Sequence, residues 1–240
     1  PLDIQRSGDD MLFIYTGGTT GMPKAVMWRH EDLWHALGSG ANAPCTSGRA
    51  PESPAEHLRN LSEYPGVLKQ LTACPLMHGT GLLTSMSILM GGGCVVTLPS
   101  PGLNVEELWQ TIDDVKVNSI VIVGDAFAKP MLKALDDHPQ RWDISSLGAM
   151  VSSGVMWSPQ VKRGLLEHNK KMLLMDAFGS TEAVGFGTSV TTIDQAPANA
   201  RFSIGEHCKV FNEDFVEVVP GSGERGVIAR TGAIPVGYYK

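Results

Sequence analysis

Residues 13–24, which read FIYTGGTTGMPK, form a segment whose residue types suit the binding of a polyphosphate. Glycines let the backbone turn its N–H groups toward one point, and threonines add hydroxyl donors. A concavity of such donors closed by the cation of Lys24 suits phosphate oxygens. A plain Gly/Thr-rich turn between two strands is the alternative, but the specific order of the residues favours a phosphate-binding loop.

The loop differs from the common P-loop of nucleoside triphosphatases. That motif has glycine directly before its lysine and serine or threonine directly after it. Pro23 and Ala25 occupy those positions here. A buried strand is predicted at residues 12–15, and another strand, not a helix, is predicted at residues 24–28. The sequence therefore predicts a phosphate loop of another kind.

A second candidate segment, residues 176–182 (DAFGSTE), follows an apolar strand predicted at residues 172–175. The carboxyl end of a strand is where an active-site loop belongs in an α/β sheet. A flat ring such as Phe178 suits a flat base, and a carboxylate such as Glu182 beside polyphosphate requires a hard cation between them. Taken alone, the segment could instead be an ordinary capped loop with Phe178 in the core.

Together the two segments resemble the adenylate-forming superfamily, which contains acyl- and aryl-CoA synthetases, adenylation domains of peptide synthetases and luciferases. The superfamily pattern Tyr-Thr-Ser-Gly-Thr-Thr-Gly-x-Pro-Lys-Gly is matched from Tyr15, with Gly18 for the usual serine and Ala25 for the last glycine. The resemblance implies that the loop binds the phosphates of ATP. The loop residues concerned are Thr16, Gly17, Gly18, Thr19, Thr20, Gly21 and Lys24.

The same resemblance implies roles in the second segment and in a third one. Phe178 would stack on adenine, Thr181 would meet the α-phosphate, and Glu182 would hold magnesium. Residues 151–158 (VSSGVMWS) resemble the superfamily segment Ser-Gly-Gly-Ala-Pro-Leu-Ser, whose backbone lines the other face of adenine, although one glycine, the alanine and the proline are replaced. A strand-to-helix turn capped by Ser158 is the alternative. The nucleotide-binding residues implied in these segments are Ser153, Gly154, Val155, Asp176, Ala177, Phe178, Gly179, Ser180 and Thr181.

His78, in the segment Pro-Leu-Met-His-Gly-Thr-Gly, matches a position where fatty and aromatic acid CoA synthetases carry histidine and amino-acid-activating domains usually carry phenylalanine. In the former it gates or orients the carboxylate side of the acyl pocket. The resemblance therefore implies that His78 is catalytic, with Thr181 and Glu182. An ordinary hydrogen-bonded polar residue is the alternative. The other histidines show no metal-ligand spacing, and the Gly-x-Ser-x-Gly elbow of serine hydrolases does not occur.

The implied function is ATP-dependent activation of a fatty or bulky hydrophobic acid to acyl-AMP and then to acyl-CoA, with ATP, Mg²⁺ and CoA as cofactor and co-substrates. Two alternatives stay open: an acyl-AMP ligase or adenylation domain that loads a carrier protein, and a nucleotide-binding fragment without catalysis. No aspartate follows His78 closely to hold an α-amino group, which disfavours an amino acid substrate. The acid, the acceptor thiol and the oligomeric state are left open.

Strands that alternate with helices predict an α/β fold, with a mostly parallel sheet flanked by helices. Asn104 is predicted to cap a helix whose apolar residues follow a period of about 3.6, and Pro130 weakens the next predicted helix. Residues 38–56 are rich in Gly, Ala, Ser and Pro and predict a mobile loop, with a short helical turn at residues 55–61. The predicted helices are 30–38, 82–90, 105–115, 126–135 and 159–168. The predicted strands of the sheet are 71–74, 94–98, 120–123, 149–151 and 172–175, and the strand at 94–98 is predicted to be buried.

The sequence pattern changes near residue 200, where short β-rich runs separated by turns begin. We expect an α/β nucleotide- and acyl-binding core over residues 1–199, part of a large N-terminal domain, and a truncated β-rich subdomain over residues 200–240. Glycines 221, 223 and 226 match Gly-x-Gly-x-x-Gly, but a strand follows instead of a helix, so a hairpin turn is favoured over a dinucleotide site. The resemblance implies that the C-terminal lid, with its catalytic lysine, is absent and that these residues alone do not catalyse adenylation.

The composition is that of a soluble globular protein, with 42% hydrophobic and 18% charged residues. A net charge of −6 and the absence of a Lys/Arg run argue against a nucleic-acid partner or a membrane-surface patch. The sequence has no apolar stretch long enough to span a bilayer and no signal peptide. Its scattered cysteines favour free thiols and a cytoplasmic location.

Overall fold

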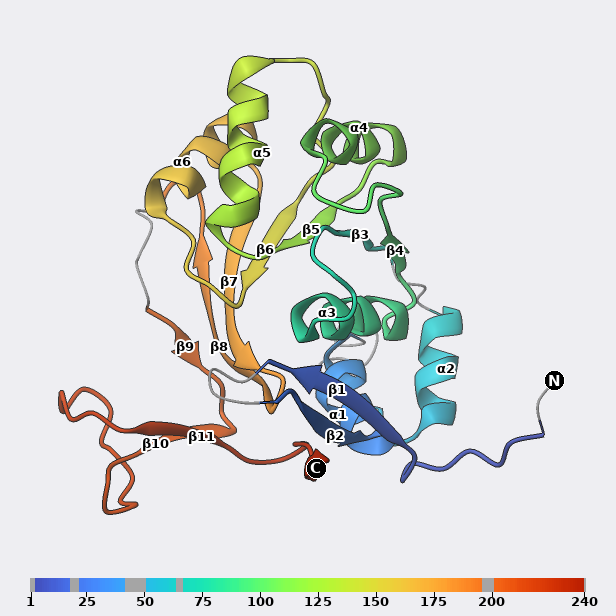
Figure 1. The fold of residues 1–240 in the computed structure, drawn as a ribbon, viewed down its shortest axis with the longest axis vertical. Coiled ribbons are helices and arrows are strands. Elements are labelled where there is room, and N and C mark those ends of the chain that lie inside the picture. Colours follow the sequence, from blue (N-terminus) through green and yellow to red (C-terminus); the bar gives the residue numbers. More distant parts are fainter. Residues whose placement is uncertain (1–2, 18–21, 42–50, 64–66, 196–200, 240) are drawn as a thin grey trace.

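A seven-stranded sheet forms the centre of the fold, in the order β4-β3-β5-β6-β7-β8-β9 (Figure 1). The computed structural model describes residues 3–17, 22–41, 51–63, 67–195 and 201–239. Strands β3, β4, β5, β6 and β7 pair in parallel, and β8 and β9 are added antiparallel. The predicted mostly parallel sheet flanked by helices is confirmed. Its strands are β3 Lys69–Thr72, β4 Cys94–Val96, β5 Ser119–Ile122, β6 Ala149–Ser153, β7 Leu173–Ser180, β8 Ala183–Thr191 and β9 Ser203–Ile204.

The helices of the described ranges connect the strands, and α4, α5 and α6 pack on the seven-stranded sheet (Figure 1). They are α1 His30–Ala41, α2 Pro54–Glu63, α3 Gly79–Met90, α4 Val105–Val115, α5 Asp125–Asp137 and α6 Pro159–His168. Helix α6 has the bounds predicted for it. Of the loop predicted at residues 38–56, residues 42–50 lie outside the described residues, and the expected helical turn after it is the longer helix α2. Within the described ranges, no helix combines the length and the apolarity needed to cross a bilayer.

The main core lies where α4, α5 and α6 pack on the sheet. Asn104 caps α4 as predicted, because its side chain accepts a hydrogen bond from the backbone N–H of Glu107. Trp109, on the apolar face of α4, is fully buried and donates from Nε1 to the carbonyl of Met131, at 3.1 Å. Helix α5 continues through Pro130 despite its missing N–H. We attribute this to the burial of the apolar face of α5, which offsets the cost of an internal proline.

A second, smaller sheet is antiparallel and has the order β1-β2-β12. Its strands are β1 Met11–Thr16, β2 Lys24–Arg29 and β12 Gly237–Tyr239. Ile14, Val26 and Trp28 point from it into a core that α1 and α3 complete through Leu33 and Leu83. Because α3 also packs against β3 and β4 of the large sheet, it joins the two sheets.

The prediction of buried strands at residues 12–15 and 94–98 was wrong for β1 and β4. Phe13 and Tyr15 are 41% and 62% exposed, so β1 alternates between a buried and an exposed face, as a strand with one solvated face does. In β4, Cys94 is exposed because the strand lies at the edge of the large sheet. A continuous apolar run does not distinguish these two cases from a central strand.

The described strands after residue 200 contribute to three sheets. Strand β9 extends the seven-stranded sheet, β10 (Cys208–Phe211) and β11 (Val227–Arg230) pair with each other, and β12 extends the small sheet beside β2. The strand expected after the glycine-rich turn at residues 221–226 is confirmed as β11. The division of the chain near residue 200 stays a prediction.

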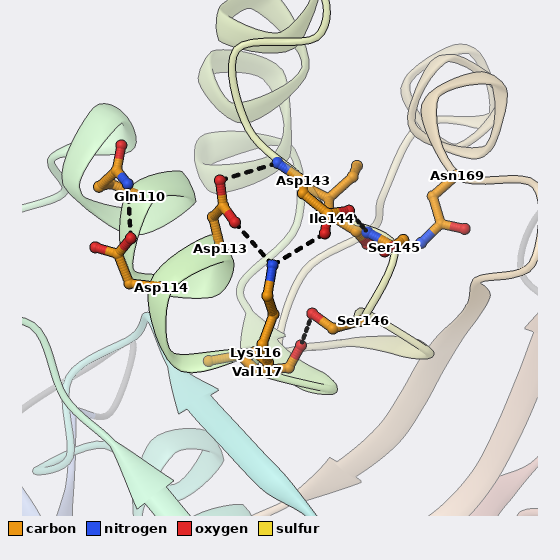
Figure 2. A network of polar contacts seen from close by, with 10 residues as sticks. All are labelled: Gln110, Asp113, Asp114, Lys116, Val117, Asp143, Ile144, Ser145, Ser146 and Asn169. Atoms are coloured by element: carbon orange, nitrogen blue, oxygen red, sulfur yellow. Dashed lines mark hydrogen bonds and ion pairs between the residues drawn. The ribbon is translucent and has the colours of Figure 1, made fainter.

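A polar network fixes the segment that leads from α5 back to β6 (Figure 2). The ammonium of Lys116, at the end of α4, donates to the carboxylates of Asp113 and Asp143, each at 2.9 Å. The hydrogen bond and charge of Lys116, together with the backbone N–H of Asp143, lower the pKa of Asp113. Hydrogen bonds from Ser145, followed by the one from Lys116, lower the pKa of Asp143. The network therefore stabilises the folded chain while both carboxyl groups are ionised.

Lys116→Met is expected to destabilise the protein more at neutral pH than at pH 3. The pKa values of both carboxyl groups are lower in the folded state, so the stabilisation is present above the unfolded pKa of about 3.9 and is lost as the pH falls through the folded values. Urea unfolding of both proteins between pH 7 and pH 3, in about unit steps, measures the difference. Lys133→Met, which removes the exposed pair of Lys133 with Asp137, is the control. A destabilisation that does not change with pH would contradict the assignment.

Candidate active site

A cavity of about 630 Å³ opens where the β1–β2 hairpin, the start of α3 and the β7–β8 hairpin meet. Most of the described residues predicted for the nucleotide site line it. These are Thr16, Gly17, Lys24, His78, Ser153, Gly154, Ala177, Phe178, Gly179, Ser180, Thr181 and Glu182. The loop residues Gly18, Thr19, Thr20 and Gly21 lie outside the described residues. The cavity thus brings together residues from four distant parts of the sequence.

The predicted phosphate loop connects two antiparallel strands. Thr16 ends β1 directly opposite Lys24, the first residue of β2, and the hydroxyl of Thr16 donates to the carbonyl of Lys24 at 3.4 Å. The pair closes the base of the loop, so both ends of the segment are held at the cavity. The segment therefore connects two antiparallel strands, and both of its ends, Thr16 and Lys24, lie at the cavity.

The second predicted segment is a β-hairpin, not the loop predicted after a strand ending at residue 175. Strand β7 continues to Ser180, and β8 returns antiparallel from Ala183, leaving Thr181 and Glu182 as the turn. The pairing shifts register between Phe178 and Ser180. Small and polar residues in β7 gave no strand pattern, but backbone pairing with β6 and β8 holds them in the sheet.

The turn of this hairpin is anchored on the small sheet and on α3. The indole Nε1 of the fully buried Trp28 donates to the carbonyl of Thr181 at 2.9 Å. Gly79, the first residue of α3, lies so close that a Cβ atom there would be 2.8 Å from the hydroxyl oxygen of Thr181. Trp28 was not singled out from the sequence, because its partner is 153 residues away. These contacts hold the turn against β2 and the start of α3.

Tyr238 lies between the two charged groups predicted to act together. Its hydroxyl donates to Oε1 of Glu182 at 2.8 Å, and the ammonium of Lys24 lies 5.5 Å from the centre of its ring. The hydrogen bond to Glu182, followed by burial, raises the pKa of Tyr238. Lys24 and Glu182 therefore lie at one cavity, on the same side of the molecule. No local pattern in the sequence singles out Tyr238.

His78 both lines the cavity and caps α3. Its Nδ1 accepts a hydrogen bond from the backbone N–H of Thr80 at 3.2 Å. In the neutral imidazole this bond assigns the proton to Nε2. The helix therefore begins at Gly79, earlier than the predicted residue 82, and the cap fixes the position of His78 at the cavity edge.

A second cavity, of about 310 Å³, lies next to the first and shares Gly154, Ala177, Phe178 and Gly179 with it. The predicted nucleotide-binding residues Val155 and Asp176 line this second cavity and not the first. Phe178 is 40% exposed between the two, so the alternative that places its ring in the core does not hold. Its ring centre lies 5.3 Å from each of the rings of Phe186 and Phe202.

Contacts with the β5–α5 turn fix the end of β6 and the loop that follows it. Gly124 donates its N–H to the hydroxyl of Ser152 at 2.8 Å, and a Cβ atom on it would lie 2.4 Å from Cγ2 of Val155. Its φ of +55° also favours glycine. Ser158 occupies the N-cap position of α6, but its side chain does not cap the helix as predicted. Its hydroxyl and N–H instead donate to Asp125.

A buried ion pair lies beside the second cavity. Lys162 is 2% exposed, and its ammonium donates to Asp176 and lies 5.5 Å from the centre of the Trp157 ring. The sequence did contain a signal for it: Lys162 shares the buried face of α6 with Leu165 and Leu166. A lysine on the apolar face of a helix indicates a buried partner, because an unpaired buried charge is costly.

Comparisons with known proteins agree with this geometry. A family model described as an AMP-binding enzyme matches residues 2–239. The 3-oxocholest-4-en-26-oate–CoA ligase of Rhodococcus rhodochrous is 39% identical over 243 residues, which cover 98% of this chain and 42% of the relative. The medium/long-chain-fatty-acid–CoA/3-oxocholest-4-en-26-oate–CoA ligase of Mycobacterium marinum is 39% identical over 241 residues, which cover 100% of this chain and 42% of the relative.

A solved structure shares the fold. The luciferase-like enzyme of the mealworm Zophobas morio superimposes with a TM-score of 0.71 at 19% identity, covering 99% of this chain and 52% of that chain. The chain spans 42% of the length of each of the two ligases.

Proposed function

The chain belongs to the AMP-binding enzyme family, and we propose that the full-length protein uses ATP to activate a hydrophobic carboxylic acid and transfers it to CoA. The observation that carries this proposal is the meeting of Lys24 and Glu182 at one cavity, through Tyr238. A cation and an acid so placed suit a polyphosphate and its counter-ion. Relatives named as CoA ligases support the choice of reaction.

In this proposal the loop over residues 16–24, including Gly18, Thr19, Thr20 and Gly21, binds the phosphates of ATP. Phe178 stacks on adenine, with Ser153, Gly154 and Val155 on the other face, and Asp176 also belongs to the nucleotide site. Thr181 meets the α-phosphate, and His78 orients the carboxylate of the acid. The exposed ring of Phe178 beside two joined cavities supports this arrangement.

Magnesium is the cation that the donor set fits best. No group of three or more His, Cys, Asp or Glu residues that could hold a metal occurs in the described part of the chain. Mg²⁺ is commonly bound by one or two carboxylates together with substrate phosphates. Glu182 offers one carboxylate at the cavity, and Tyr238 occupies its Oε1, which leaves Oε2 for a cation. When bound, the cation would neutralise charge on the pyrophosphate that leaves.

The reaction proceeds in two displacements. The carboxylate of the acid attacks the α-phosphorus of ATP and pyrophosphate leaves, which gives acyl-AMP. The CoA thiol then attacks the acyl carbon and AMP leaves, which gives acyl-CoA. The acid and ATP supply the nucleophile and the leaving group, so the residues of the cavity contribute position and charge neutralisation.

The acid proposed is a fatty acid or a steroid side-chain acid. The names of the relatives include 3-oxocholest-4-en-26-oate and medium- and long-chain fatty acids. The apolar side chains of Leu83 and Val184 line the large cavity beside His78, which supports a hydrophobic acyl group. A cytoplasmic location is part of the proposal, supported by the free thiols of Cys74, Cys94 and Cys208.

The function is tested by acid-dependent exchange of labelled pyrophosphate into ATP. The full-length protein is assayed with saturated fatty acids of increasing length, a steroid side-chain acid and a set of amino acids, each with and without Mg²⁺. We expect exchange with hydrophobic acids only, dependent on Mg²⁺, followed by product formation with CoA. Exchange with amino acids, or transfer to a carrier protein but not to CoA, would contradict the proposal.

A further inference from the structure

Tyr238 connects the two charged groups of the cavity without belonging to either predicted segment. Its hydroxyl donates to Oε1 of Glu182 at 2.8 Å, while the ammonium of Lys24 lies over its ring. Because the hydroxyl occupies one carboxylate oxygen, the other is left available. We propose that Tyr238 is a positioning residue that orients the Glu182 carboxylate toward the cation bound to the nucleotide phosphates. This inference rests on the proposed function.

Backbone pairing with β2 fixes the strand that carries Tyr238. Strand β12 pairs with β2, with Tyr238 opposite Val26, and the N–H of Val236 donates to the carbonyl of Met27 at 2.9 Å. Strand β2 also begins with Lys24, at the end of the phosphate loop. The hydroxyl of Tyr238 is therefore set by the same sheet that holds the loop.

Glu182 needs such a partner because it lies in the turn between β7 and β8. A glutamate side chain at a turn has several rotamers, and each would aim its carboxylate differently. Hydrogen bonds from a neighbouring group to a metal-binding carboxylate fix its orientation, and their loss typically costs about 10- to 100-fold in metal affinity. The hydroxyl of Tyr238 is in position to supply this bond.

The ring of Tyr238 also contacts the ammonium of Lys24. A cation over an aromatic face is attracted by the ring, and this contact holds the ammonium near the cavity. Tyr238→Phe removes the hydroxyl and keeps the ring, whereas Tyr238→Leu removes both. The two variants therefore separate the bond to Glu182 from the contact with Lys24.

Tyr239 is a matched control on the same strand. Its ring packs edge-on against Phe13, with ring centres 5.4 Å apart. Successive side chains of a strand point to opposite faces of the sheet, so Tyr239 and Tyr238 lie on different faces. Tyr238 and Tyr239 are 46% and 57% exposed, so loss of either hydroxyl should change the stability of the fold little. A shared effect of both substitutions would indicate a structural role for β12, and an effect of Tyr238→Phe alone would indicate positioning.

The test measures equilibrium binding of α,β-methylene-ATP to the full-length protein at a series of Mg²⁺ concentrations. Tyr238→Phe should raise the Mg²⁺ concentration needed for half-maximal binding by about 10-fold or more. Binding of AMP without Mg²⁺ should stay within about 2-fold of wild type, and Tyr239→Phe should match wild type, because neither removes the bond to Glu182. Tyr238→Leu should also weaken Mg²⁺-free binding of the analogue.

Two results would overturn the inference and are distinguishable from failure of the proposed function. An unchanged Mg²⁺ requirement in Tyr238→Phe, in a protein whose wild type binds the analogue, rejects the role of Tyr238 alone. An equal rise in the Mg²⁺ requirement of Tyr239→Phe would also reject the role of Tyr238 alone. A wild-type protein that does not bind the analogue rejects the proposed function, and this inference with it.

Discussion

Glu182→Gln is expected to lower acid-dependent pyrophosphate exchange by about 100- to 1,000-fold in the full-length protein, at Mg²⁺ concentrations that saturate wild type. Glutamine keeps an amide oxygen that can accept the hydroxyl of Tyr238, so the substitution removes the negative charge and leaves that contact in place. The charge is what a hard cation requires from its ligand. The measurement is the exchange rate over a range of Mg²⁺ concentrations.

Glu167→Gln is the matched control for this prediction. Glu167 lies on α6, where its side chain is 55% exposed and pairs with Arg163 on the surface. The control should exchange at the wild-type rate, and the AMP affinity of Glu182→Gln in the absence of Mg²⁺ should not change. A fall of less than about 3-fold for Glu182→Gln would mean that the carboxylate does not serve the reaction, since losing such a group normally costs far more.

Lys162→Met is expected to destabilise the fold by about 3–5 kcal/mol, because it leaves the carboxylate of Asp176 without its buried partner. Lys162 is 2% exposed, and the Asp176 side chain is 15% exposed beside the second cavity. A buried charge that loses its counter-charge is far more costly than a surface one. Urea unfolding followed by tryptophan fluorescence measures the change in the free energy of unfolding.

Two further variants define what the Lys162 result means. Lys129→Met removes an exposed helical pair with Asp125 and should cost about 0.5 kcal/mol or less. The double variant Lys162→Met/Asp176→Leu removes both buried charges and should recover part of the lost stability. If the double variant is less stable than Lys162→Met, the cost comes from lost packing and not from an unpaired charge.

The sequence predicted best those elements whose pattern lies within the element itself, such as a helix cap or a regular apolar face. Helix α4 has an asparagine cap and a regular apolar face, and α6 begins with a proline in its first turn, so both were predicted close to their observed bounds. Lys24 and Glu182 end two segments with an unusual order of residues, and both line one cavity as expected. These features depend on residues that lie within a few positions of one another.

The missed features depend on contacts between distant segments. The predicted strand at residues 172–175 stops before the observed end of β7 at Ser180. The small and polar residues after 175 form a strand only through pairing with β6 and β8. The hydrogen bond of Tyr238 joins residues 56 positions apart, and that of Trp28 joins residues 153 positions apart. No periodicity or local motif encodes such pairs. For Lys162 the signal was present, as a lysine on the buried face of α6.

The central claim is that the β1–β2 loop and the β7–β8 turn bind one nucleotide between them. The most direct test is a crystal structure of the full-length protein with α,β-methylene-ATP and Mg²⁺. We expect phosphate oxygens against the loop that ends at Lys24, a cation on Glu182 and the adenine ring against Phe178. A nucleotide that contacts the loop while Glu182 and Phe178 face only solvent, or one bound elsewhere on the protein, would contradict it.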